Sequence, residues 1–297
     1  MNRQLSVLGF ALLLGIAAGA GPVRAADDAT DNSAPERDGS ATTPAVRDGA
    51  RGWWATRTPD EKVLATNLGV IGFISGWGLV YWDYGTRKPR AESEGWFAQN
   101  TTEGGADKTG HLYTGYVLGR GFSGLFRRYG YDERKVARAG AISSLVATTW
   151  MEVGDSFSAY GFSHEDMAMN AAGAGAAWLL AANPSLDAKF ALRGEFDPFT
   201  GATGDLLTDY EVWRYYATVK LDGFARMPQP LRWIELHAGY YARGYHDADP
   251  ANNRRYTFVG VGLSLTKMAR ALGWQRTATF LDYYQPPGTV ARNDDQQ

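Results

Sequence analysis

Hydrophobic and polar positions follow two different periods on either side of residue 196. Before it, long apolar stretches alternate with short polar connections, and polar residues recur three or four positions apart, on one face of a helix. After it, apolar and polar residues alternate in short runs bounded by Pro, Gly and Asn, as in antiparallel strands. The sequence therefore predicts an α+β protein: a bundle of about four helices over residues 51–195, followed by a small antiparallel β-sheet over residues 196–290.

The first predicted helix begins near Pro59, with Thr58 as its N-cap. No charged residue occurs from Val63 to Trp82, a stretch long enough to cross a bilayer. Its four glycines weaken that signal, and Gly72-x-x-x-Gly76 suits close contact with another helix. We expect this helix to pack against the other three, so that carbonate or high salt releases the mature protein from membranes.

The other elements follow from end signals and from the change of period. Ser163 is the expected N-cap of the fourth helix, which ends near Asn183-Pro184. The remaining expected elements are helices over 108–129 and 133–157, a short helical segment over 186–195, and strands within 213–221, 234–240, 259–265 and 278–284.

The N-terminal residues have the composition of targeting segments. Residues 1–25 resemble a secretory signal peptide, with Arg3 before an apolar stretch and a small-x-small site at 23–25. Residues 26–50 lack a hydrophobic period and are predicted to be a disordered leader. The mature protein is therefore expected in the periplasm or elsewhere in the cell envelope, and association with the membrane fits this location.

Composition excludes several classes of function. The sequence has no cysteine, which excludes a disulfide partner, a thiolate metal site and a lipid anchor on cysteine. The formal net charge is −2, with both signs mixed along the chain, so we expect no binding to nucleic acid.

Three polar motifs interrupt the apolar helices. Buried ionisable side chains are costly unless they meet each other, a ligand or a metal, so we expect the three motifs to share one centre. The members are Asp107, Lys108 and His111 in the first motif, Glu152 and Asp155 in the second, and Ser163, Asp166 and Asn170 in the third.

Three roles are open to this cluster. It can be a structural network that ties the helices together. It can bind a ligand or a divalent metal, with His111, Glu152, Asp155 and Asp166 as candidate ligands, although the sequence requires no cofactor. It can also be catalytic, with His111 as general base, Asp107 orienting it and Glu152 assisting.

The remaining histidines carry weaker signals. His164 is expected to be exposed beside a helix N-cap, whereas His237 and His246 are expected to be ordinary surface or cross-strand residues, since no second metal donor lies at ligand spacing.

The motif order resembles that of the YfiM-type family of bacterial envelope proteins. The resemblance covers roughly residues 96–185 and includes Gly161 and Gly173 around the third motif. It implies a periplasmic protein of unknown function, often lipid-anchored in that family, but this chain has no cysteine to lipidate. A fainter similarity connects the same order to VanZ-like membrane proteins.

These observations favour an envelope protein with a binding or scaffolding role centred on the Asp/His/Glu/Asn cluster, and with an envelope component or the membrane surface as its partner. The alternative is a hydrolase or transferase, metal-dependent or not, that acts on envelope lipid or glycan. Whether the chain is an enzyme stays open at this point.

Overall fold

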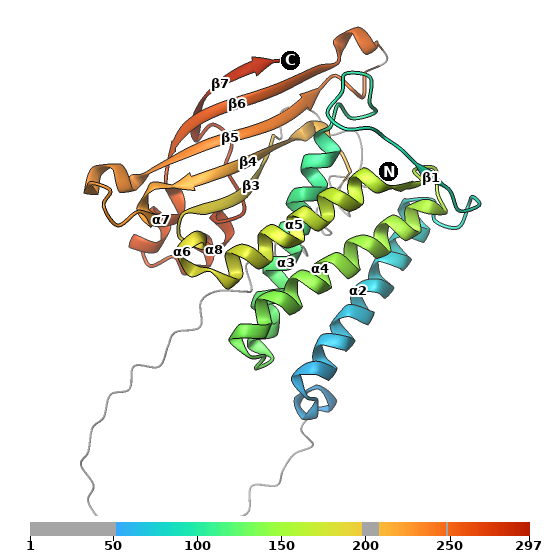
Figure 1. Ribbon diagram of the computed structural model, residues 1–297, viewed down its shortest axis with the longest axis horizontal. Coiled ribbons are helices and arrows are strands. Elements are labelled where there is room, and N and C mark those ends of the chain that lie inside the picture. Colours follow the sequence, from blue (N-terminus) through green and yellow to red (C-terminus); the bar gives the residue numbers. More distant parts are fainter. Residues whose placement is uncertain (1–51, 198–207, 248) are drawn as a thin grey trace, which may run out of the picture.

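The computed structural model describes residues 52–197, 208–247 and 249–297. The predicted signal peptide, residues 1–25, and the predicted leader, residues 26–50, lie outside the described residues. The described chain forms a layer of helices beside a five-stranded antiparallel sheet (Figure 1), which confirms the α+β prediction.

Long helices make up the first layer. The predicted caps are present: Thr58 accepts a hydrogen bond from the Glu61 N–H, and Ser163 accepts one from the Asp166 N–H. Capping satisfies N–H groups that have no partner inside the helix and so fixes where each helix begins. The bounds are α2 (Pro59–Tyr81), α3 (Ala106–Arg128), α4 (Glu133–Ser156) and α5 (His164–Ala182), with a 3-10 turn at Trp53–Thr56 and a short α6 (Pro184–Asp187).

The sheet has the strand order β3-β4-β5-β6-β7, and each neighbouring pair is antiparallel. Two short helices, α7 (Leu265–Ala271) and α8 (Gln275–Leu281), connect its last two strands. A separate parallel pair joins β1 (Ala91–Glu92) to β2 (Phe162–Ser163). The strands of the sheet are β3 (Phe190–Phe196), β4 (Trp213–Lys220), β5 (Ile234–Arg243), β6 (Arg254–Leu263) and β7 (Val290–Gln296).

Two element predictions in this region are wrong. The segment 186–195, expected to be helical, contains most of β3, whose residues pair with β4 in an antiparallel ladder, and such tertiary pairing overrides local helix propensity. The segment 278–284, expected to be a strand, lies largely in α8. The sequence analysis also missed β7, a charged edge strand without an apolar alternation.

Close packing of α3 against α5 depends on two glycines. A Cβ atom on Gly173 would lie 2.1 Å from the Leu112 carbonyl oxygen, and one on Gly115 would lie 2.6 Å from the Asn170 carbonyl oxygen. Any side chain at either position would push the two backbones apart. The contact brings the start of α3 beside the first turns of α5, where the polar motifs lie.

Aromatic side chains join the helical layer to the sheet. Tyr113 of α3 packs against Trp213 and Tyr215 of β4, with ring centroids 6.5 and 5.6 Å away. Its hydroxyl donates a 2.7 Å hydrogen bond to the Tyr283 carbonyl, beyond α8. This buried core fixes the sheet, and the loops at its edge, relative to the start of α3.

The prediction that α2 packs inside the bundle is wrong. It lies along α4, and a Cβ atom on Gly72 or Gly76 would meet no atom within 4 Å. The Gly-x-x-x-Gly pair therefore mediates no helix contact in this chain. Leu64, Leu68 and Leu79 are 60%, 59% and 67% exposed, so most of the apolar surface of α2 is unburied.

Candidate functional site

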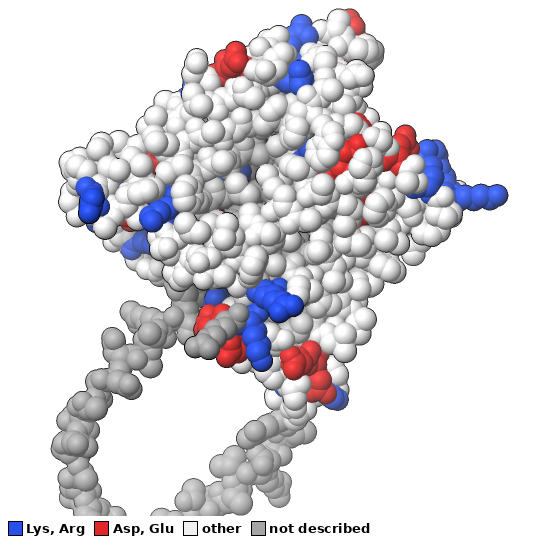
Figure 2. All heavy atoms as spheres, viewed as in Figure 1, with Lys and Arg blue, Asp and Glu red and all other residues white. Residues whose placement is uncertain are grey.

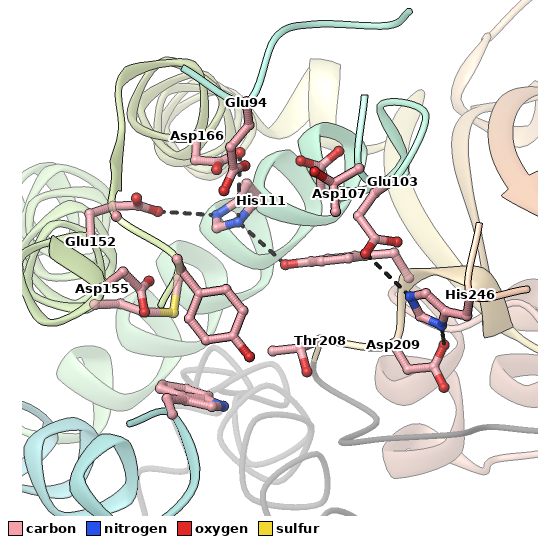
Figure 3. A pocket seen from close by; sticks show the side chains of 16 residues that line it. Glu94, Glu103, Asp107, His111, Glu152, Asp155, Asp166, Thr208, Asp209 and His246 are labelled. Atoms are coloured by element: carbon pink, nitrogen blue, oxygen red, sulfur yellow. Dashed lines mark hydrogen bonds and ion pairs between the residues drawn. The ribbon is translucent and has the colours of Figure 1, made fainter. Parts of the chain in front are cut away.

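The polar motifs meet at one end of the helical layer, where α3 and α5 begin and α4 ends (Figure 3). Asp107 and His111 come from the first two turns of α3, Glu152 and Asp155 from the last two turns of α4, and Asp166 from the first turn of α5. They line a cavity of about 280 Å³ that also receives residues from the loops before α3 and around β5.

His111 is the centre of one hydrogen-bonded group. Its Nδ1 lies 3.2 Å from Asn170 Oδ1 and 3.6 Å from Glu152 Oε1, and Asn170 Nδ2 donates to the same Glu152 oxygen at 3.3 Å. On the other side of the ring, Nε2 lies 3.3 Å from the Tyr210 hydroxyl and 3.7 Å from Asp166 Oδ1. The ring is thus held by three helices and by the turn before β4.

Asp107 does not have the role expected for it. Its carboxylate lies 2.6 Å from Lys108 Nζ, and the contacts of His111 are to other side chains. Although Asp107 and His111 share a helical face, Asn170 and Glu152 orient the imidazole instead. This replaces the predicted Asp107–His111 pair.

Lys108 is buried inside a triangle of carboxylates. Its ammonium lies 2.6 Å from Asp107, 2.8 Å from Glu94 and 2.8 Å from Asp166. Burial alone would lower the pKa of Lys108, but the charges of Asp107 and Asp166 outweigh it and raise that pKa. The side chain is therefore a fixed positive charge at the cavity wall.

Ser163 supports the site from behind. Its hydroxyl caps α5, and its N–H donates to Glu152 Oε2 at 3.4 Å. The residue is 1% exposed, so its role is to position Glu152 and the first turn of α5 rather than to face the cavity.

The cavity carries an excess of acid. Glu152 and Asp155 lie at the C-terminal end of α4, where the helix dipole disfavours a negative charge. Burial, followed by the neighbouring Asp166, raises the pKa of Glu152 to about 9. Burial raises the pKa of Asp155 to about 7, and burial with the Asp166 contact raises that of Glu94 to about 8. Among the described residues, seven carboxylates and two imidazoles line the cavity: Glu94, Glu103, Asp107, Glu152, Asp155, Asp166, Asp209, His111 and His246.

His246 lies across the same cavity, so its assignment as an ordinary surface or cross-strand residue is wrong. Its Nε2 lies 3.2 Å from Glu103, and its Nδ1 lies 3.6 Å from Asp209 and 3.8 Å from Glu211. The hydrogen bond with Glu103 raises the pKa of His246 to about 9. By contrast, His164 is exposed and His237 bonds across strands to Thr218, as expected.

Helical spacing did not identify Glu94, Glu103 and Tyr210 as members of the site, because each lies in a loop or turn outside the long helices. Glu94 and Glu103 come shortly before α3 along the chain, whereas Tyr210 reaches His111 only because the sheet docks onto α3.

Two carboxylate-containing trios have a geometry suited to a metal ion. The donor atoms of His111, Glu152 and Asp166 lie within 4.8 Å of one another, and so do those of Glu94, Asp107 and Asp166. The Lys108 ammonium lies among the three acids of the second trio and supplies the positive charge there. Asp155, a predicted ligand, lines the cavity and belongs to neither trio.

Residues 93–182 match a family described as "Predicted periplasmic lipoprotein (DUF2279)". The matched segment contains α3, α4 and α5 and therefore all three polar motifs. No curated protein and no solved structure matches the chain. The family description points to the periplasm or cell envelope and gives no activity.

Proposed function

We propose that this chain is a cell-envelope protein whose acidic pocket binds a divalent cation through His111, Glu152 and Asp166. The bound ion would face the adjoining cavity and present a positive charge to an envelope component. The observation that carries this proposal is the surplus of buried carboxylates around one cavity. The family match and the resemblance to YfiM-type proteins support the envelope location.

The charge balance favours an ion. Near His111 the cavity wall combines Glu152 and Asp155, which do not contact Lys108, with Asp166, which shares the Lys108 ammonium with Glu94 and Asp107. Carboxylates buried together must either take up protons or bind a cation, since like charges at short range cannot all remain ionised. The raised pKa values of Glu152 and Asp155 express this conflict in the metal-free protein.

The donor set and its spacing fit a first-row divalent metal. Imidazole nitrogen together with carboxylate oxygen suits Zn²⁺ or Mn²⁺. Donors about 2.0–2.4 Å from an ion lie at most about 4.8 Å from each other, as in this trio. Asn170 bonds both His111 and Glu152, and such supporting contacts fix the orientation of ligands.

The cavity also argues against a purely structural network. Polar side chains that only join helices fill the space between them, whereas these adjoin about 280 Å³ of free volume. A scaffold would gain nothing from leaving that volume beside an excess of acids.

The test is metal binding to the full chain after treatment with EDTA. We expect isothermal titration with Zn²⁺ or Mn²⁺ to give one site, and metal at 100 times its Kd to stabilise the fold by about 2.7 kcal/mol. Glu152→Gln should weaken binding by more than the roughly 10–100-fold lost when a supporting residue is removed. Glu165→Gln is the matched control, because this equally buried acid next to Asp166 is bonded to Ser93, Gly95 and the Ser163 hydroxyl and belongs to neither trio. Equal affinity in the two variants would refute the assignment.

A hydrolase or transferase acting on envelope lipid or glycan is the second candidate. It is favoured by His246, which lies across the cavity from the metal trio (Figure 3), and by Tyr210, whose hydroxyl lies 3.3 Å from His111 Nε2. Three protein ligands leave a coordination position for water, which a metal can activate. In that case His246→Gln should reduce turnover of an envelope phospholipid or glycan while leaving metal affinity unchanged.

A further inference from the structure

The polar and apolar sides of α2 are reversed relative to a soluble surface helix. Its polar side chains point toward neighbouring helices: Asn67 donates to Ser143 at 3.0 Å, and Ser75 accepts from Trp150 Nε1 at 2.9 Å. Its outward side carries leucines, a phenylalanine and glycines. The exposed positions of α2 in its uncharged stretch are Leu64, Leu68, Gly69, Gly72, Phe73, Gly76, Leu79, Val80 and Tyr81.

A helix in water exposes its polar side and buries its apolar one. A helix in lipid does the opposite, since polar groups have to find partners within the protein. The side-chain hydrogen bonds of α2 follow the second rule.

The length and ends of α2 match a bilayer. Among the described helices it is the one long and apolar enough to cross a membrane, with a mean hydropathy of 1.7 over an 18-residue window that is 6% buried. Its 23 residues extend about 35 Å, against a hydrocarbon core of about 30 Å. Trp53 and Trp54 lie before its first turn, and Trp77, Tyr81 and Trp82 at its end, where aromatic rings favour membrane–water interfaces.

The two neighbouring helices continue this surface. No charged residue occurs from 139 to 151 in α4 or from 167 to 182 in α5. Along α4 the exposed side chains in this stretch are Ile142, Val146 and Trp150, spaced by one turn, and Trp178 and Leu179 are exposed on α5. On the face shown in Figure 2 the area over these helices is white, with Lys, Arg, Asp and Glu gathered toward its ends.

We propose that the outward sides of α2, α4 and α5 lie against the acyl chains of a lipid bilayer, and that α2 crosses the hydrocarbon core. This apolar band consists of the exposed α2 positions given above together with Ile142, Val146, Trp150, Trp178 and Leu179. Lipid, rather than a second copy of the chain, is its occupant, because the uncharged length and the aromatic ends of α2 match a bilayer. A helical attachment also suits a chain without a cysteine to lipidate.

This arrangement places the acidic pocket at the membrane–water interface. Trp82, directly after α2, lines the cavity beside Met151 and Glu152 of α4. The proposed lipid contact does not depend on the cation, because a metal-free pocket would lie at the same depth relative to the bilayer.

The proposal can be tested with spin labels, because the sequence has no cysteine and a label therefore attaches only to an introduced one. Single cysteines replace Leu68, Val146 or Leu179, with Ala251→Cys as an exposed control in the turn between β5 and β6. Each full-length variant is spin-labelled in vesicles of phosphatidylethanolamine and phosphatidylglycerol. We expect the three band positions to collide several-fold more often with oxygen than with a water-soluble nickel chelate, and Ala251→Cys to show the reverse.

Two outcomes would overturn the proposal. Band positions that behave like Ala251→Cys would lie in water, and suppression of both collision rates would mean that protein covers the band. Carbonate extraction of the unsubstituted chain is an independent measurement, which does not depend on the variants folding. Retention in the membrane supports lipid contact by α2, and release contradicts it.

Discussion

Two buried polar networks of this protein differ in charge balance. In the sheet, Arg193 of β3 donates to both carboxylate oxygens of Glu235 at 2.5 and 3.0 Å and to Gln285 at 2.9 Å. Ser264 also donates to Glu235, at 2.8 Å. One cation meets one anion, and the surrounding side chains are at most 3% exposed. At the end of the helical layer, by contrast, acids outnumber bases beside a cavity.

The difference separates a structural from a functional use of buried charge. A closed, neutral pair keeps its charges ionised and contributes to a unique packing arrangement. An acidic surplus next to a cavity costs stability, and proteins tolerate such a cost mainly where something binds. This contrast supports the proposal that the His111 cluster binds a ligand, whereas the Arg193–Glu235 pair is structural.

Breaking the neutral pair should have the largest effect. Glu235→Ala leaves the Arg193 guanidinium buried without its counter-ion, and loss of one partner of such a pair costs about 3–5 kcal/mol. Urea unfolding monitored by circular dichroism measures this directly. The matched control is Glu92→Ala, which removes the exposed Arg90–Glu92 pair and should cost at most about 1 kcal/mol. Similar losses in both variants would contradict the structural assignment.

The acidic cluster should show itself as an unusual dependence of stability on pH. The pKa of Glu152 is about 9 in the folded protein against 4.5 for an ordinary glutamate, and that of Asp155 is about 7 against 3.8. At a pH below the ordinary pKa values of 3.8 and 4.5, both carboxyl groups are protonated in the folded and in the unfolded protein. As pH rises to about 9 the unfolded chain releases these protons first, so the metal-free fold loses about 1.4 kcal/mol per pH unit for each group that is protonated only in the folded state.

The measurement is the free energy of unfolding as a function of pH in EDTA. Glu152→Gln removes one titrating group and should flatten the upper part of the curve, whereas Glu165→Gln should leave that part unchanged, since the pKa of Glu165 is lowered in the fold, partly by its hydrogen bond from Ser93. A stability that rises steadily from acid to alkaline pH would show that the acids are already neutralised by groups within the protein.

The contrast between the two networks also shows what the sequence could predict. Helical spacing and capping residues located α3, α4 and α5, so His111, Glu152, Asp166 and Asn170 could be named before the fold was known. Their close approach depends on Gly115 and Gly173, which are visible in sequence only as small residues on the facing sides.

The features that the sequence did not predict all depend on tertiary contacts. Arg193 and Glu235 pair across 42 positions of sequence, and β3 forms by pairing with β4, although its segment has a helical composition. His246 reaches the cavity because β5 ends beside the start of α3, an arrangement set by the aromatic core. The exposed side of α2 escaped prediction because composition does not distinguish a core helix from a lipid-facing one.

Within the His111 cluster, the free energies of unfolding of double variants should be non-additive only for residues that are in contact. His111→Ala removes the partner of Asn170 and Glu152 and should cost about 1–3 kcal/mol in the metal-free protein. Combined with Asn170→Ala the loss should be less than additive, by about 0.5 kcal/mol or more. Combined with Asp107→Ala it should be close to additive, since Asp107 pairs with Lys108. Double-mutant cycles based on urea unfolding measure both coupling free energies. Strong coupling between His111 and Asp107 would support the predicted Asp107–His111 pair instead.

The smallest expected effect compares two serine caps, one in each network. Ser163 accepts from the Asp166 N–H at the start of α5, and Ser264 accepts from the Lys267 N–H at the start of α7. Loss of either cap should cost about 1 kcal/mol. Ser264→Ala should cost somewhat more, because its hydroxyl also donates to Glu235 at 2.8 Å, a shorter bond than the 3.3 Å bond from the Ser163 hydroxyl to Glu165.

Metal binding should change the stability loss of only one of these two serine variants. Saturating Zn²⁺ or Mn²⁺ is expected to enlarge the loss from Ser163→Ala, because Asp166 is then a ligand and its position in the first turn of α5 depends on the Ser163 hydroxyl. The loss from Ser264→Ala should stay the same with and without metal, since the Arg193–Glu235 pair has no part in binding. An equal response of the two caps would mean that the two networks do not differ in function after all.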